Sequence, residues 1–192
     1  MKHAIAIFAI ALSAFAIADV TWEFDDSTDL VTSRCITGIR VHNSLVMGQT
    51  EWDPYIRTFV PIEGIDVSSL PYLTVRLYSS GEADTLSAYY KCKDGLWGLG
   101  KTFPVIKGWA TYRADLREAA WNEGGMAADA RQWGGVSKLI NAFRIDPGNQ
   151  DGRWIVFDTV SLTAEPTGEL GVSPEPTGKI AEATITCPLA AT

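Results

Sequence analysis

Histidine is nearly absent from this chain, which has two in 192 residues. His3 lies in an apolar N-terminal segment, so only His42 is available to a Ser-His-Asp site, and it stands in an ordinary strand-like run. The sequence also has no G-x-S-x-G, no G-x-G-x-x-G after a strand, no P-loop and no H-E-x-x-H. These absences argue against the familiar serine hydrolases, nucleotide-binding enzymes and zinc proteases.

Carboxylates are plentiful, but they form no recognisable catalytic pair. Glycoside hydrolysis needs two acids about 5–10 Å apart, and no two acids are spaced within one predicted strand as a dedicated acid and base. Asp146 precedes Pro147, where capping of a turn is the simpler role for an Asp. The sequence therefore predicts a protein that is not an enzyme.

Long apolar runs are also missing, except at the N-terminus. Residues 4–18 follow a short basic start and are almost wholly apolar, but they are too few for a membrane span of about 20 residues. Ala16-Ile17-Ala18 is a small-x-small pattern that signal peptidase reads. Residues 1–18 are thus predicted to be a signal peptide, and the mature chain to be secreted or held at the cell surface. The net charge of −7 argues against nucleic acid or an anionic membrane as partner.

Alternation of apolar and polar residues is the main structural signal. It is clearest in residues 73–78, whose odd-numbered members are apolar. About nine short strands recur along the chain, and only residues 117–133 suggest a short helix. Residues 51–54 are predicted to form a turn and residues 94–100 a glycine-rich loop. The pattern predicts an all-β fold, an antiparallel β-sandwich of the jelly-roll type, over residues 19–164.

The composition changes after residue 164. Glu-Pro-Thr-Gly occurs at 165–168 and again at 175–178, in a stretch dominated by Pro, Thr, Gly and Glu. This composition is typical of an extended linker, so residues 165–192 are predicted to be a linker or disordered tail. A linker here suggests a module that accompanies a catalytic domain or a larger assembly.

The three cysteines permit one disulfide in an exported chain. Cys35 and Cys92 both fall in the predicted domain, whereas Cys187 lies in the tail. Spacing does not fix geometry, so a Cys35–Cys92 bridge and two buried thiols both remain open.

Aromatic residues are the remaining chemical resource, with seven Trp and six Tyr. Their flat faces can stack on the apolar C–H faces of sugar rings, while polar neighbours bond the hydroxyls. Trp97, in the glycine-rich loop, is the first candidate, followed by Trp52 in the turn and Trp121 in the helical segment. The other four tryptophans are predicted to be packed: Trp22, Trp109, Trp133 and Trp154.

A second candidate set occupies the alternate, polar positions of two predicted strands that are neighbours in sequence, residues 73–78 and 85–92. If these strands pair, the four side chains share one face, although a plain solvated sheet face is an equal alternative. The set consists of Arg76, Tyr78, Tyr89 and Lys91.

Asp158 stands on an otherwise apolar stripe between Trp154 and Leu162, so it needs a partner. It would find one at a β-bulge, or by holding a calcium ion together with Glu23 or Asp25. Calcium takes several oxygen ligands, so these three acids are the predicted ligands of a structural calcium ion.

Six phrases follow one another along the chain: WEFD (22–25), DPY (53–55), LPYLTVR (70–76), GWATYRADL (108–116), FRIDPGN (143–149) and IVFDTVSL (155–162). Together they resemble the galactose-binding-like jelly-roll carbohydrate-binding modules of secreted bacterial glycoside hydrolases. The resemblance covers about three quarters of the chain. It implies the fold, a structural calcium near the first and last strands, and sugar-binding loops that vary between members.

The sequence thus predicts non-catalytic binding of a polysaccharide or glycan, with Trp97, Tyr78, Tyr89, Arg76 and Trp52 as contacts. Two alternatives stay open. One is an exported structural or adhesion module that binds protein and has no sugar site. The other is a jelly-roll glycanase or lyase, which needs two carboxylates, or a Tyr, Arg and His set, in one cleft.

Overall fold

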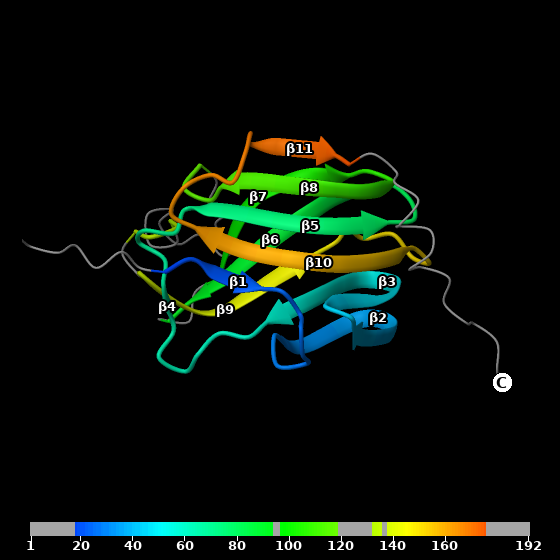
Figure 1. The fold of residues 1–192 in the computed structure, drawn as a ribbon, viewed down its shortest axis with the longest axis horizontal. Helices are drawn as coiled ribbons and strands as arrows, with labels where there is room; N and C mark the ends of the chain where they lie inside the picture. Colours follow the sequence, from blue (N-terminus) through cyan, green and yellow to red (C-terminus); the bar gives the residue numbers. More distant parts are fainter. Residues whose placement is uncertain (1–17, 94–96, 119–131, 136–137, 176–192) are drawn as a thin grey trace, which may run out of the picture.

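The computed structural model describes residues 18–93, 97–118, 132–135 and 138–175, which form an all-β antiparallel sandwich (Figure 1). Its strands are β1 (Val20–Trp22), β2 (Leu30–His42), β3 (Leu45–Thr58), β4 (Ile65–Asp66), β5 (Tyr72–Ser79), β6 (Ala83–Cys92), β7 (Trp97–Val105), β8 (Gly108–Asp115), β9 (Leu139–Asp146), β10 (Trp154–Thr163) and β11 (Gly171–Pro174). The predicted signal peptide, Trp121 and Cys187 lie outside the described residues. Within these residues, no helix is long and apolar enough to cross a membrane.

The strands form two layers. The front sheet has the order β11-β8-β5-β10 followed by the first half of β3, and β1 pairs with β10. The back sheet has the order β9-β6-β7, next to the second half of β3, and β4 pairs with β9. In Figure 1, strands β6, β7 and β9 cross behind β5, β8 and β10. The pairs β5 and β6, and β9 and β10, are consecutive in sequence but lie in different sheets.

Strand β3 belongs to both sheets and forms a corner of the sandwich. Residues 46–49 pair with β10, whereas residues 56–58 pair with β9. Asp53, between the two halves, has a φ of 50° and is followed by Pro54. Corners of this kind are made by strands that switch sheets through bends or bulges. The predicted turn at 51–54 is therefore wrong, because the chain bends there without ending the strand.

The core lies between the layers and follows from the alternation in the strands. In β5 every second residue is buried, as the sequence predicts. Trp22 stacks on Phe143 with ring centroids 5.6 Å apart, and Trp133 meets Tyr90 edge-on at 4.8 Å. The two indole N–H groups donate to backbone carbonyls at 2.7 and 2.9 Å, as buried tryptophans require. The packed positions predicted for Trp22 and Trp133 are confirmed.

The beginning of the predicted linker is part of the sandwich. Residues 171–174 form β11, which pairs with β8, and Thr167 bonds the hydroxyl of Thr74 at 2.8 Å. Without β11, strand β8 would expose its backbone groups as a sheet edge. The boundary predicted at residue 164 is therefore wrong for residues 165–175, and residues 176–192 lie outside the described part.

The two cysteines of the domain do not form a disulfide with each other. Cys35 is half-buried on β2, and Cys92 is buried on β6. The sequence left open a Cys35–Cys92 bridge or two thiols, and the structure has two thiols.

Candidate functional site

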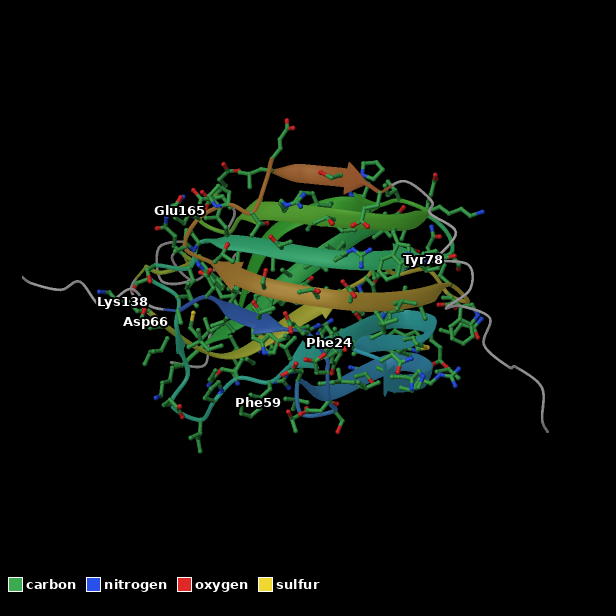
Figure 2. All side chains as sticks on the ribbon, in the orientation of Figure 1. Phe24, Phe59, Asp66, Tyr78, Lys138 and Glu165 are labelled. Carbon is green, nitrogen blue, oxygen red and sulfur yellow. The ribbon has the colours of Figure 1, made fainter. Side chains whose placement is uncertain are left out.

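The predicted contact residues are divided between the two sheets. Arg76 and Tyr78 lie on β5, and Figure 2 shows Tyr78 on the front sheet near the end of that strand. Tyr89 and Trp97 lie on β6 and β7 of the back sheet. The shared face predicted for the second candidate set does not exist, because β5 pairs with β8 and β10 whereas β6 pairs with β7 and β9.

Arg76 is held by carboxylates on the front sheet. Its Nε and Nη2 donate to Glu175 at 2.9 and 2.8 Å, and its Nη1 donates to Asp158 at 2.8 Å. The guanidinium carbon lies 4.5 Å from the centroid of the Trp109 ring. Hydrogen bonding from Arg76 also holds the pKa of Glu175 below its usual value. Arg76 therefore links β5 to β10 and to the residue after β11, rather than presenting a free group to a ligand.

Trp109 belongs to the same front-sheet cluster, because its ring lies 5.7 Å from the ring of Tyr78. It is half-buried on the outer side of the sheet, so the prediction that it packs in the core or plugs one end of the sandwich is wrong for the core. The outward position follows from its place opposite Tyr78 in the β5–β8 ladder, since directly opposed residues share a face.

Asp158 finds its partner at a β-bulge. The β5–β10 register shifts between Phe157 and Thr159, which turns the Asp158 carboxylate toward Arg76. Among the described residues, no group of three or more His, Cys, Asp or Glu side chains could hold a metal ion. Asp25 instead accepts a hydrogen bond from Ser44. Asp158 and Asp25 thus have other partners in the described part of the chain, and calcium binding stays a prediction.

A surface rich in aromatic and cationic residues covers the outward side of the back sheet, and we call it the aromatic face. Its members in the regular parts of β3, β6 and β9 alternate with core residues, so their side chains lie on the outward side of the sheet. The aromatic face consists of Tyr55 and Arg57 on β3, Tyr89 and Lys91 on β6, Trp97 on β7, Arg144 and Asp146 on β9, and Trp52, Asp53 and the adjacent Arg34 at the bend of β3.

Strand register brings these side chains together. Arg57 is opposite Arg144, and Arg144 is in turn opposite Tyr89. Lys91 is opposite Trp97 on the other side of β6. Residues far apart in sequence thus form one continuous row across three strands.

Arg144 is the centre of the aromatic face. Its guanidinium carbon lies 3.9 Å from the centroid of the Tyr55 ring and 5.1 Å from that of Tyr89, so it is held between two aromatic rings. Nε and Nη2 both donate to the carboxylate of Asp146, and Nη2 also lies 3.4 Å from Asp53. Rings and acids together fix the plane of the guanidinium, which makes Arg144 a rigid donor.

The pKa of Asp146 is raised to about 6, mainly by burial and to a smaller extent by the nearby Asp53 charge. The hydrogen bonds and charge of Arg144 act in the opposite direction. The Asp146 side chain is only 9% exposed, so the cost of desolvating its charge is the largest influence. At neutral pH the group is ionised and paired with Arg144.

Two tryptophans extend the aromatic face. Trp97 begins β7, so its predicted place inside a loop is wrong, and Arg57 lies 5.8 Å from its ring centroid. Trp52 is 61% exposed, and Arg34 lies 5.3 Å from its ring. Of the predicted contacts, Trp97, Tyr89 and Trp52 thus belong to one surface.

Sequence reasoning missed the central residues of this surface. Tyr55 and Arg144 alternate with the core residues Ile56, Phe143 and Ile145, a pattern that marks them as outward-facing. Alternation could therefore have identified each one as exposed. It could not show that β3, β9 and β6 are neighbours.

The arrangement combines flat aromatic surface with fixed hydrogen-bonding groups. Trp97 and Tyr89 supply rings on the neighbouring strands β7 and β6, and Tyr55 supplies one on β3, on the other side of β9. Arg144 and Asp53 supply a donor and an acceptor. A ligand suited to such a surface has apolar faces and a rim of polar groups. A sugar ring has both.

No protein-family model matches the chain, and no curated protein matches it. Among solved structures, PfGH50B aligns with a TM-score of 0.54 and 16% identity over 78% of this chain, which spans only 24% of PfGH50B. Two variants of CBM29-2, a family 29 carbohydrate binding module, each align with a TM-score of 0.50 and 8% identity over 77% of this chain. The alignments cover 93% of one variant's chain and 92% of the other's. At these identities the likeness concerns the fold. The chain has the fold of a jelly-roll carbohydrate-binding module, as the sequence resemblance predicted.

Proposed function

We propose that this chain binds a polysaccharide non-catalytically on the aromatic face. The observation that carries the proposal is the Tyr55–Arg144–Tyr89 stack, with Trp97 on the same side of the same sheet. The stack lies on the outward surface of the sheet, where the Trp97 ring and the fixed guanidinium can meet a ligand, and it also ties β3, β9 and β6 together. The fold shared with CBM29-2 supports the same function.

Each part of the face has a role in binding. A sugar ring would lie on Trp97 or Tyr89, where its C–H groups meet the ring face. Arg144 donates to Asp146 through Nε and Nη2, and Nη1 makes no hydrogen bond to any residue that the structure describes. That nitrogen would donate to a sugar hydroxyl. Because the guanidinium is already held between two rings, little side-chain entropy is lost on binding.

Hydrolysis has one observation in its favour, since Asp53 and Asp146 both approach Arg144 and Asp146 has a raised pKa. However, both oxygens of Asp146 accept bonds from Arg144 and the side chain is nearly buried. A general acid must reach the glycosidic oxygen, and a nearly buried carboxyl held by two bonds is poorly placed to do so. We therefore propose that Asp146 orients Arg144. Release of reducing ends from a bound polysaccharide, lost in Asp146→Asn, would support the hydrolase instead.

Two further features belong to the proposal. Residues 1–18 have the features of a signal peptide, which supports export, and N-terminal sequencing of the exported protein should then begin at Asp19. The likeness to PfGH50B, together with the sequence resemblance, supports a role beside a glycoside hydrolase.

The proposal is tested by measuring binding of the full chain to a panel of soluble and insoluble polysaccharides. Trp97→Ala and Tyr89→Ala should each weaken binding about tenfold or more, because each removes a stacking surface. Tyr78→Ala is the matched control on the front sheet and should bind like the unaltered chain. All three variants should show the circular dichroism spectrum of the unaltered chain.

Unaltered binding in both back-sheet variants, or its loss in Tyr78→Ala, would place the site elsewhere and overturn the assignment. Failure to bind any polysaccharide would instead favour the protein-binding alternative.

A further inference from the structure

The charges of the aromatic face are not balanced. The face has four cationic side chains, Arg34, Arg57, Lys91 and Arg144, and two carboxylates, Asp53 and Asp146, which is a local net charge of +2. The whole chain has a net charge of −7. A cationic surface on an acidic protein attracts anionic groups there and repels them elsewhere.

Both carboxylates are directed at the same cation. Asp146 accepts two bonds from Arg144, and Asp53 approaches the same guanidinium. Within the described part of the chain, Arg34, Arg57 and Lys91 have no carboxylate within ion-pair distance.

Two arginines elsewhere in the domain have carboxylate partners, whereas Arg113 and Arg153 bond hydroxyl or carbonyl oxygens. Arg76 has two carboxylate partners and Arg117 has Asp115. Glu51, the acid next to Trp52, is bonded to Thr37. Three cations that have no ion-pair partner among the described residues thus lie together on the aromatic face.

Each of the three cations lies beside a tryptophan. Arg57 is 5.8 Å from the Trp97 ring, Arg34 is 5.3 Å from the Trp52 ring, and Lys91 is opposite Trp97 across two paired strands. A sugar stacked on an indole directs its substituents outward from the edge of its own ring. Cations next to the indole therefore meet those substituents, and a carboxylate or sulfate there would form charge-assisted bonds.

We propose that the ligand of the aromatic face is an anionic polysaccharide, in which carboxylate or sulfate groups on stacked sugars bind Arg57, Lys91 and Arg34. This inference rests on the proposed function and adds the class of polysaccharide. Arg57 and Arg34 present planar forks that match both oxyanions, whereas Lys91 acts as a point charge. Arg144 keeps its role as hydroxyl donor, because Asp146 neutralises it.

The test compares polymers that differ in charge alone. Isothermal titration calorimetry of the full chain uses polygalacturonate against its methyl-esterified form, and a sulfated galactan against its desulfated form. At least one charged polymer should bind about tenfold or more tightly than its neutral twin at low salt, and the difference should shrink as salt is raised. The two pairs show whether carboxylate or sulfate is recognised.

Variants then assign the preference to residues. Arg57→Gln and Lys91→Gln should each lower affinity for the charged polymer severalfold while changing affinity for its neutral twin little. Arg113→Gln, on β8 of the front sheet, is the charge-matched control and should leave both affinities unchanged. Trp97→Ala should weaken binding of both polymers.

Each outcome decides a separate question. Equal or tighter binding of the neutral twins would overturn the anionic class and leave the proposed function standing. Binding of no polysaccharide would overturn the proposed function itself. Equally tight binding of polyglutamate, a polyanion without sugar rings, would show that the surface recognises charge alone and would overturn both.

Discussion

Removal of Arg144 should destabilise the domain in a way that depends on pH. Arg144→Met leaves the Asp146 carboxylate, 9% exposed, without its cation. Breaking a buried ion pair from one side costs about 3–5 kcal/mol, and the 23% exposure of Arg144 favours the lower end, about 3 kcal/mol at pH 8. For a domain of this size each kcal/mol lowers the melting temperature by about 2–4 °C. The variant should therefore melt roughly 6–12 °C below the unaltered chain at pH 8.

The sign of the pH dependence follows from the pKa of Asp146, which is raised to about 6 in the folded chain. A group whose pKa is higher in the folded than in the unfolded chain contributes stability that is fully present below its unfolded pKa, which is about 4 for Asp. That stability is lost as pH rises through the folded pKa. Without Arg144 the folded pKa rises further, so the variant continues to lose stability at higher pH. At pH 5 both chains contain neutral Asp146, and the difference should shrink to about 1 kcal/mol.

Differential scanning calorimetry at pH 5 and pH 8 measures this difference. The double variant Arg144→Met with Asp146→Asn is the control, because an amide does not ionise and leaves no buried charge. It should recover most of the stability lost at pH 8 and show little dependence on pH in this range. An equal loss at both pH values, or a double variant as unstable as the single one at pH 8, would refute the reasoning.

Two further predictions concern packing and the end of the described chain. In Gly98→Ala the new Cβ would lie 2.4 Å from the buried Tyr90 ring, so urea unfolding should show that the variant is less stable by about 1–3 kcal/mol. Gly81→Ala is the control, because its new Cβ would meet nothing nearer than 3.4 Å and should change stability little. Equal effects of the two substitutions would contradict this packing. Glu175→Gln removes the carboxylate, 28% exposed, that pairs with Arg76. The substitution should lower the free energy of unfolding by about 1 kcal/mol at pH 7. Because the pKa of Glu175 is lowered, this difference should be present above the usual Glu value and should be lost as pH falls through the lowered folded value; a constant difference would count against the ion pair.

Much of the fold could be predicted because alternation is a local property. Residues 73–78 alternate in the sequence and in β5, and Trp22 shares the parity of the buried Phe24. Burying one parity of each strand requires a second layer, so a sandwich follows from many short strands. The bend within β3 was missed because Asp53-Pro54 is also a turn signal, and only the partners of the two half-strands show that the strand continues.

The candidate site was predicted in part. Trp97 and Trp52 were identified as aromatic residues in a predicted loop and turn, and Tyr89 by its place among the polar positions of a strand, whereas Arg144 and Tyr55 were not identified. Arg76 was chosen for the same reasons of type and parity, but two carboxylates hold it. Glu175 was placed in a linker by composition, although it provides one of those carboxylates.

The sequence by itself determined which side of each strand faces the core, because alternation depends only on the chemical character of successive residues. It also determined the poverty in catalytic groups, since the chain has only two histidines and lacks the motifs of nucleophilic catalysis. The tertiary structure alone decided which outward residues share a surface. Strand partners are set by how all the apolar faces can be buried together, so β9 lies between β3 and β6 and brings Arg57, Arg144 and Tyr89 into one row.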